Sequence, residues 1–439
     1  MTNTSMPPSP IRMSDLRSIP DAHDYLEREA RRLSEEARHA SITAGDDGVV
    51  GIVGAGTMGR TIAMAVRLAG LRAILIDRDE AQRRSADDAI KRWTAQAGLS
   101  DAVCCTDDLA ELAAADIVIE AVFEDLTTKA EVLAAIDRHA SAGALLATNS
   151  SSLDIDKLGA ASRRAENFLG THFFLPAHRT PILEIVAGKA TSPNATARAM
   201  AFAARLGKLA VPAGNCDGYI GNRLFDRFYQ EAMFLAEEGA TVAAVDDALE
   251  LWGMALGPFR TLDRIGNDLI NGVCRRRASE RPGIVLPDLV GVIHDAGRHG
   301  AACGRGWYDY APNSRRGEPS SDVDALIDDF ARKHGRKRRR IDAEEIIARC
   351  VLAVMLEGQI LIAERIARSE GDIDVMFTHG YGFPASKGGP MFLARAIGAS
   401  ARDALLTFHG CHASRGPVRD AAVLKSERGD TGRAGLDRR

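Results

Sequence analysis

The chain has 439 residues, which is enough for two or three domains at the usual ~100–200 residues each. Its hydrophobic content of 46% and charged content of 26% are ordinary for a globular protein. The net charge of −4, from 56 basic and 60 acidic residues, predicts no nucleic-acid partner and no attraction to anionic membranes.

Seven cysteines are spread along the chain, and none forms a Cys-x-x-Cys pair or a Cys/His cluster with the spacing of metal ligands. We therefore expect free thiols rather than a disulfide framework, and no metal site. The N-terminus lacks an apolar signal segment, no apolar run approaches the ~18 residues of a membrane span, and the final Leu-Asp-Arg-Arg is neither a peroxisomal nor an ER-retention address. These features predict a cytoplasmic protein without a membrane segment.

The first segment, residues 1–47, begins rich in Pro and Ser and continues as a polar helical stretch, DAHDYLEREARRLSEEARHA. Tyr25, Leu26 and Leu33 give this stretch only a thin apolar stripe. We expect an N-terminal extension or linker helix rather than a domain.

Residues 48–213 alternate between strand-like apolar runs and helical patterns. The runs are GVVGIVGAG, RAILID, ADIVIEAVF, GALLATN and NFLGTHFF, and ILEIVAG follows the last of them through a short turn. Runs that are apolar on both sides and separated by helices predict a mostly parallel sheet covered on both faces.

From about residue 214 the strand signal disappears and helical periodicity takes over. LFDRFYQEAMFLAEEG followed by ALGPFRTLDRIG resembles CVLAVMLEGQILIAERIA followed by KGGPMFLARAIG. We interpret these segments as two tandem copies of one helical repeat, residues 214–332 and 333–410, with two unrelated hairpins as the alternative. The basic run KHGRKRRR between them is expected to be a solvated linker rather than a nucleic-acid patch, and residues 411–439 are expected to be a disordered tail.

The first predicted strand runs into Gly54, Gly56 and Gly59, which have G-x-G-x-x-G spacing and open a predicted helix. The first Gly allows a tight turn, the second a close approach to a pyrophosphate at the helix N-terminus, and the third close packing of helix on strand. Asp77 ends the next strand, where a carboxylate accepts both ribose hydroxyls and repels a 2′-phosphate. We predict a Rossmann-like domain that binds NAD rather than NADP, although Arg78 could hold a 2′-phosphate; FAD binding and a ligand-free turn are the alternatives.

A serine cluster and a His–Glu pair follow at later strand ends. TNSSSLDI follows the strand GALLA, so Ser151 is expected at the edge where open α/β sheets bind ligands, unless Ser151 or Ser152 only caps a helix. Imidazole, with an unperturbed pKa of ~6.5, suits removal of a hydroxyl proton while hydride leaves carbon. We therefore predict His172 as a general base and Glu184, on the adjoining strand, as the carboxylate that fixes its tautomer; a structural histidine and a surface carboxylate are the alternative.

Several motifs occur together in the order and spacing of the 3-hydroxyacyl-CoA dehydrogenase family: VGIVGAGTMG, DIVIEAVFEDLTTK, TNSSSL, THFFLPAHRTPILEIVAG and DGYIGNRL. The resemblance covers roughly residues 48–400. With two helical copies and the ending HGYGFPASKGGPMF, the chain most resembles the dehydrogenase half of the multifunctional fatty-acid β-oxidation enzyme, without the enoyl-CoA hydratase half. The resemblance implies an α/β Rossmann-like NAD-binding domain, an all-α domain of two tandem repeats, and NAD-dependent oxidation of L-3-hydroxyacyl-CoA to 3-ketoacyl-CoA.

The resemblance also implies roles for matched positions. His172 matches the catalytic base, Glu184 its carboxylate partner, Ser151 the residue that hydrogen-bonds the substrate 3-oxygen, and Asn222 the Asn that completes the site from the helical domain. Glu124 and Lys129 match residues on the nicotinamide side. The full set of cofactor-binding positions that it implies is Gly54, Gly56, Thr57, Met58, Gly59, Asp77, Glu124, Lys129 and Asn149.

The second helical copy reads ARC at 348–350 where the first reads NRL at 222–224, so it lacks the Asn. One active site per chain is expected. Because relatives with one copy dimerise through it, a tandem copy implies a monomeric core.

Two positions and the length of one segment depart from the family pattern. Leu175 stands where a polar residue is usual and Ala302 where Lys is usual, and only 46 residues separate Asp77 from Glu124, where the family usually has a longer helical hairpin on the CoA side. Two alternatives therefore stay open. One is a dehydrogenase of a smaller 3-hydroxy acid or carrier-protein thioester, and the other is a non-catalytic NAD-binding scaffold that associates with a separate hydratase or thiolase.

Overall fold

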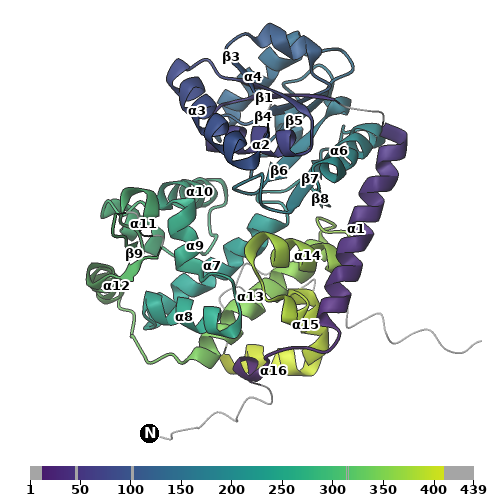
Figure 1. Ribbon diagram of the computed structural model, residues 1–439. Helices are drawn as coiled ribbons and strands as arrows, with labels where there is room; N and C mark the ends of the chain where they lie inside the picture. The colour runs from purple at the N-terminus through teal and green to yellow at the C-terminus, as the bar shows by residue number, and fades with distance from the viewer. Residues whose placement is uncertain (1–11, 45–47, 100–102, 313, 315, 410–439) are drawn as a thin grey trace, which may run out of the picture. The chain divides into compact units, whose positions relative to one another are not determined.

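The computed structural model describes residues 12–44, 48–99, 103–312, 314 and 316–409 (Figure 1). The chain divides into two compact units. The α/β unit comprises Asp24–Arg223 and Arg365–Gly380, and the helical unit comprises Met1–His23, Leu224–Glu364 and Tyr381–Arg439. The expected tail, residues 411–439, lies outside the described residues.

An eight-stranded sheet forms the centre of the α/β unit, in the order β3-β2-β1-β4-β5-β6-β7-β8 (Figure 1). Every neighbouring pair is parallel except β6 and β7, which are antiparallel. The strands are β1 Val49–Val53, β2 Arg72–Ile76, β3 Cys104–Thr106, β4 Ile117–Glu120, β5 Leu145–Thr148, β6 Phe168–Phe173, β7 Ile182–Ala187 and β8 Leu209–Gly214. The prediction of a mostly parallel sheet is confirmed, since β4 and β5 are buried along their whole length as strands covered on both faces must be.

Two strands of this sheet, β3 and β8, were not predicted. β3 is only three residues long and follows a polar segment. β8 contains Pro212, which weakens the strand pattern. β8 lies at the edge of the sheet and pairs only with β7, a position where the missing N–H of proline is tolerated.

Helices connect the strands of the α/β unit. They are α2 Thr57–Leu68, α3 Glu80–Ala97, α4 Leu126–His139, α5 Ile155–Gly159 and α6 Pro193–Arg205, with short 3₁₀ turns η2 Leu109–Ala114 and η3 Ala165–Asn167. Side-chain oxygens cap several of their N-termini: Asp79 caps α3, Asp125 α4, Asp154 α5 and Ser192 α6. The helix-capping alternative for Ser151 and Ser152 is therefore wrong, because Asp154 fills that role.

The N-terminal helix α1, Ala22–Ala44, packs against α14, Glu370–Tyr381, within the α/β unit. The Tyr25 hydroxyl donates to Asp374 at 2.8 Å, and the Arg32 guanidinium donates to Asp372 at 2.6 Å. At Gly371 a Cβ atom would lie 2.2 Å from the Glu29 carboxylate, so the two helices approach too closely there for a side chain. The thin apolar stripe predicted for this helix is buried.

The helical unit holds most of the C-terminal half. Its elements are α7 Gly221–Glu238, which starts at the end of the α/β unit, α8 Val242–Trp252, α9 Pro258–Ile265, α10 Asn267–Glu280, α11 Leu289–Asp295, α12 Ser321–Lys333, α13 Ala343–Ala363, α15 Pro390–Ile397 and α16 Ala399–His409, with η1 Met13–Asp15, η4 Ala301–Cys303 and η5 Ala385–Lys387. A two-stranded ribbon of β9 Tyr308–Asp309 and β10 Glu318–Pro319 was not predicted. Two residues per strand leave no detectable periodicity.

The internal repeat appears as a matching series of helices, α7 to α10 and α13 to α16. The third helix of each series, α9 and α15, has eight residues, starts with a proline that follows glycine, and ends before another glycine. The second helices have 11 and 12 residues. This agreement in helix length and in the flanking Gly and Pro residues favours tandem copies over two unrelated hairpins.

Helix α13 corrects one expectation. It has 21 residues and an 18-residue window of mean hydropathy 2.0, so by length and composition it could cross a membrane. However, 78% of that window is buried inside the protein, as in a core helix. It also carries Arg349 and Glu357, which pair with Glu231 and Arg227 of α7.

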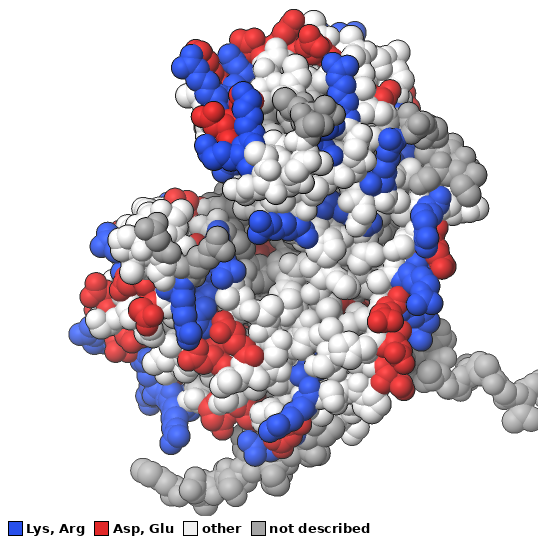
Figure 2. All heavy atoms as spheres, viewed as in Figure 1, with Lys and Arg blue, Asp and Glu red and all other residues white. Residues whose placement is uncertain are grey.

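The basic run at 333–340 links α12 to α13, as expected, but it is not simply solvated. Arg336 lies 3.0 Å from Glu237, Arg339 3.0 Å from Glu238, and Arg338 3.1 Å from Asp328. Figure 2 shows basic and acidic side chains interspersed on the face in view, without a large patch of one sign.

Candidate active site

The loop after β1 is shaped to hold a phosphate group. Gly54 has a φ of +112°, and a Cβ atom there would lie 2.6 Å from the carbonyl oxygen of Ala121. A Cβ at Gly59 would lie 1.8 Å from the carbonyl oxygen of Gly54. Gly56 caps α2 without a side-chain hydrogen bond, and a Cβ there would meet nothing within 4 Å. The first turn of α2 therefore faces open space, where its free amides and helix dipole favour an anion.

Asp77 lies directly after the neighbouring strand, β2. One of its carboxylate oxygens accepts the N–H of Ala55 at 2.7 Å, and the other accepts a backbone N–H of the turn that follows. Its side chain is half-buried, whereas Arg78 is exposed. Thr57 is exposed at the start of α2 and Met58 packs against the core. These positions fit a dinucleotide with its pyrophosphate on α2 and its ribose near Asp77.

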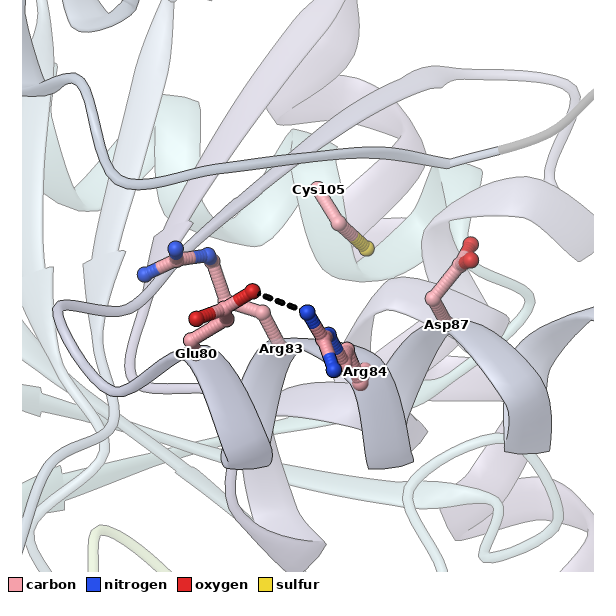
Figure 3. Close-up of a pocket in the computed structure, with 5 residues that line it drawn as sticks. All are labelled: Glu80, Arg83, Arg84, Asp87 and Cys105. Atoms are coloured by element: carbon pink, nitrogen blue, oxygen red, sulfur yellow. Dashed lines mark hydrogen bonds and ion pairs between the residues drawn. The ribbon is translucent and has the colours of Figure 1, made fainter.

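A pocket lies beside this region on α3 and β3 (Figure 3). Its lining residues are Glu80, Arg83, Arg84, Asp87 and Cys105. Figure 3 shows the ion pair between Glu80 and Arg84 across it, and Arg83 donates to the carbonyl oxygen of Asp77 at 2.7 Å. Burial raises the pKa of the Cys105 thiol to about 11, so the thiol stays protonated. None of the predicted site residues lines this pocket.

The serine cluster after β5 surrounds the carboxylate of Glu124. One oxygen of Glu124 accepts the Ser150 hydroxyl at 2.7 Å, the Ser151 N–H at 2.8 Å and hydroxyl at 3.2 Å, and the Ser152 N–H at 3.2 Å. Burial alone would raise the pKa of Glu124, but the nearby Lys129 ammonium and these hydrogen bonds lower it below its usual value. Glu124 is therefore an anion that orients the Ser151 backbone and side chain.

Lys129 lies behind Glu124 rather than at a surface. Only 1% of its side chain is exposed, and its ammonium donates to Glu120 at 2.8 Å and lies 3.4 Å from Glu124. Glu120 at the end of β4 also accepts the Thr148 hydroxyl at 2.6 Å. Asn149 joins the next strand end, since its side-chain oxygen accepts the Phe173 N–H at 2.9 Å. These buried polar contacts fix the carboxyl ends of β4, β5 and β6 relative to one another.

His172 and Glu184 are directly opposite each other on β6 and β7. The antiparallel register places both side chains on one face of the sheet, and His172 Nδ1 lies 2.5 Å from Glu184 Oε2. Both residues are buried. The other oxygen of Glu184 accepts the backbone N–H groups of Ile220 and Gly221, each at 3.0 Å. The carboxylate is thus held between the imidazole and the N-terminus of α7.

The segment that leads into α7 brings two further residues to the serine cluster. The Asn222 side-chain amide donates to the Ser151 carbonyl at 3.0 Å. Tyr219 has a φ of +49°, its hydroxyl donates to the Leu153 carbonyl at 2.9 Å, and its ring centroid lies 5.9 Å from that of His172. His172, Glu184, Ser151 and Asn222 therefore meet within the α/β unit.

Sequence reasoning missed part of this arrangement. Glu120, Ser150 and Tyr219 were not singled out, nor were the backbone amides that hold Glu184. Glu120 could have been found from its place at a strand end, and Ser150 from its place beside Ser151. A hydrogen bond from a main-chain amide, in contrast, cannot be recognised in the sequence.

A phosphate-binding turn, a carboxylate at the ribose position and a buried His–carboxylate pair on one sheet define a nicotinamide-dependent dehydrogenase of the kind that oxidises an alcohol carbon. The glycines fit the pyrophosphate because a side chain at Gly54 or Gly59 would close the turn. Comparison with known proteins agrees and is more specific. Residues 49–216 match the NAD binding domain of 3-hydroxyacyl-CoA dehydrogenase, and residues 218–310 match its C-terminal domain. The chain belongs to the 3-hydroxyacyl-CoA dehydrogenase family, and NAD is its cofactor.

Individual relatives extend the match into the second helical copy. The chain is 34% identical over 402 residues to the human peroxisomal bifunctional enzyme, which covers 85% of this chain and 55% of that protein. The dehydrogenase part of multifunctional enzyme 1 from C. elegans is 26% identical with a TM-score of 0.61, over 87% of this chain and 88% of that one. The (S)-3-hydroxybutyryl-CoA dehydrogenase from Ralstonia eutropha is 30% identical with a TM-score of 0.56, over 61% of this chain and all of that one. This chain spans about half the length of the curated relatives it matches.

Proposed function

We propose that this protein catalyses the NAD-dependent oxidation of an L-3-hydroxyacyl-CoA to a 3-ketoacyl-CoA. The observation that carries the proposal is the buried contact between His172 Nδ1 and Glu184 Oε2, 2.5 Å long, with the second oxygen of Glu184 held by the start of α7. A carboxylate fixed on both oxygens cannot turn away from the imidazole. It therefore holds one tautomer of His172, in which Nδ1 carries the proton and Nε2 has the free lone pair.

His172 Nε2 takes the proton of the substrate 3-hydroxyl as the hydrogen on carbon 3 departs as hydride. NAD, when bound, supplies the hydride acceptor. Glu184 stabilises the imidazolium that forms, and the proton leaves to solvent in a later step. The pair thus converts a secondary alcohol to a ketone without any other group on this chain having to ionise.

Ser151 and Asn222 position the substrate oxygen in this proposal. Ser151 is oriented by Glu124 through its N–H and its hydroxyl, at 2.8 and 3.2 Å, and Asn222 holds the Ser151 carbonyl at 3.0 Å. Glu124 lines the nicotinamide side, while Lys129 acts indirectly by neutralising Glu120 and Glu124 from behind.

A smaller 3-hydroxy acid or a carrier-protein thioester is the second candidate substrate. Between β2 and β3 the described residues contain the single helix α3, where the family has a longer hairpin on the CoA side. Leu175, two residues after β6, is 54% exposed where a polar residue is usual. Both differences concern the group to which the acyl chain is attached, CoA or another carrier. They leave the His172–Glu184 chemistry unchanged.

The proposal is tested by following NADH at 340 nm with acetoacetyl-CoA, a longer 3-ketoacyl-CoA, and the matching acids without CoA. We expect oxidation of NADH with the CoA thioesters, and a loss of ~10²–10⁴-fold in kcat in His172→Ala with NADH binding retained. His139→Ala, at an exposed position at the end of α4, is the matched control. Turnover of the free acids alone would replace the CoA proposal with the second candidate. NAD binding without any turnover would favour the alternative of a non-catalytic NAD-binding scaffold.

An enoyl-CoA hydratase or thiolase is the partner we propose, because the human relative, of which this chain spans 55%, is named a bifunctional enzyme. Cytoplasmic location stays a prediction. Co-purification of a stoichiometric partner from the native source tests the association.

A further inference from the structure

Two histidines and an aspartate converge in the helical unit. Asp268 lies in the first turn of α10, His294 in the last turn of α11, and His299 in the segment between α11 and η4. The helices α10 and α11 lie side by side (Figure 1). Each of the three residues offers a ligand atom, and these atoms lie within 4.8 Å of one another.

The carboxylate oxygen Oδ1 of Asp268 is the centre of this cluster. It lies 3.1 Å from His294 Nε2 and 2.6 Å from His299 Nδ1. The His299 Nδ1 atom is buried and has no hydrogen-bond partner, so its short separation from Asp268 is not an aligned hydrogen bond. A cation shared by the two side chains would satisfy both atoms.

Surrounding contacts orient the His294 ring and hold the backbone of His299 in place. His294 Nδ1 is 3.1 Å from Asp295 Oδ1, and in the tautomer in which Nδ1 donates to Asp295, Nε2 presents its lone pair on the side of Asp268. A carboxylate on the far nitrogen is the usual second contact of a metal-bound imidazole. The Asn267 N–H donates to the His299 carbonyl at 2.9 Å, which fixes the His299 segment beside the start of α10.

We propose that Asp268, His294 and His299 form a binding site for a divalent transition-metal ion, Zn²⁺ in particular. Two imidazole nitrogens and one carboxylate oxygen suit Zn²⁺, whereas Mg²⁺ and Ca²⁺ prefer oxygen ligands throughout. The Asp268 side chain is 64% exposed, so water completes the coordination. The expectation of no metal site rested on spacing alone, and these ligands come from three separate segments. The bound ion ties the first turn of α10 to the segment after α11.

Titration of the tag-free full chain with Co²⁺, read by its visible absorption, tests the site. We expect one equivalent to bind and Zn²⁺ to displace it. Asp268→Asn and His299→Ala are each expected to weaken binding by ~10-fold or more. His334→Ala, a histidine of the same unit that contacts Phe330, is the control and should bind as the native chain does.

Asp268→Asn preserves the size of the side chain and removes its charge, so it also serves if His299→Ala folds poorly. Zn²⁺ should raise the melting temperature of the native chain more than that of Asp268→Asn, because a ligand that binds only the folded state stabilises it. No stoichiometric Co²⁺ binding by the native chain, or binding that is unchanged in both variants, would overturn the proposal and leave an ion-pair cluster.

Discussion

At the scale of single residues, Glu184 is the most constrained group of the candidate site. It bonds His172 through one oxygen and two backbone N–H groups through the other. A glutamine has the same shape but carries one donor group, which must face either the imidazole or the backbone amides. Facing the backbone amides, this donor meets two other donors; facing the imidazole, it favours the other tautomer, in which Nδ1 accepts and Nε2 carries the proton.

We predict that Glu184→Gln lowers kcat by ~10²–10⁴-fold, the range of general acid–base catalysis, because His172 loses its fixed tautomer. KM for NADH should change little, since Asp77 and the glycine loop are untouched. Steady-state kinetics with a 3-ketoacyl-CoA give both values. Glu166→Gln, at an exposed position before β6, is the control, and equal activity of the two variants would contradict the role given to Glu184.

The reacting groups could be predicted because the chemistry restricts the choice of residue. An imidazole and a carboxylate on consecutive strand segments suggested a pair, and the register confirms that they are opposite each other. Tyr219 and the amides of Ile220 and Gly221 could not be predicted, because their contribution depends on the path of the backbone. The roles of Lys129 and Glu124 on the nicotinamide side remain predictions.

At the scale of elements, a buried charge network connects the first helices of the two repeats. The Arg349 guanidinium on α13 is 3% exposed and donates to Glu231 and Glu238 of α7, each at 2.7 Å. Glu231 is 1% exposed, so it depends on a nearby cation.

We predict that Arg349→Met lowers the free energy of unfolding by ~3–5 kcal/mol, as expected when one partner of a buried ion pair is removed. Arg339→Met is the matched control. Arg339 also reaches Glu238, but its side chain is 47% exposed, and a loss of ~1 kcal/mol or less is expected. Urea denaturation of both variants measures the difference, and equal losses would show that the burial of Arg349 is unimportant.

Glu237, near the end of α7, predicts a pH-dependent stability. Burial raises its pKa to about 7, although Arg336 opposes the shift. Between the ordinary pKa of 4.5 and about 7, the folded chain keeps a proton that the unfolded chain has released. The free energy of unfolding therefore falls as the pH rises through this window.

In Glu237→Gln the side chain cannot titrate, so this loss of folding stability with rising pH should disappear. Relative to the native chain, the variant should gain about 1–3 kcal/mol of stability between pH 5 and pH 8, at 1.36 kcal/mol for each pKa unit. Denaturation at both pH values measures it. Glu280→Gln, whose side chain is 53% exposed, is the matched control, and a stability difference of Glu237→Gln that does not change with pH would contradict the raised pKa.

Periodicity predicted most elements, and the exceptions have physical causes. The parallel strands are continuous apolar runs because both faces are buried, and α9 and α15 are bracketed by Gly-Pro and Gly. The strand with Pro212 and the two-residue strands β9 and β10 contain too few regular positions to be recognised. The apolar length of helix α13 was not recognised in the sequence because Arg349 and Glu357 interrupt its apolar run.

At the scale of the whole molecule, the second helical copy predicts the state of assembly. Helix α13 packs against α8, α15, α16 and η1 of the same unit, so its apolar surface is covered within one chain. We predict that the protein is a monomer of 47.1 kDa in solution. Light scattering after gel filtration measures the mass, and a stable dimer at micromolar concentration would contradict the proposal that the tandem copy replaces a partner.

The chain passes between its two units four times, after His23, Arg223, Glu364 and Gly380. Proteins fold as they leave the ribosome, N-terminal parts first. The α/β unit cannot be completed in that order, because α14, which packs on Tyr25 and Arg32 of α1, is synthesised only after helices α7 to α13. An expression fragment that stops at Arg223 would leave the buried side of α1 open to water, so the nucleotide-binding part is best produced as the full chain.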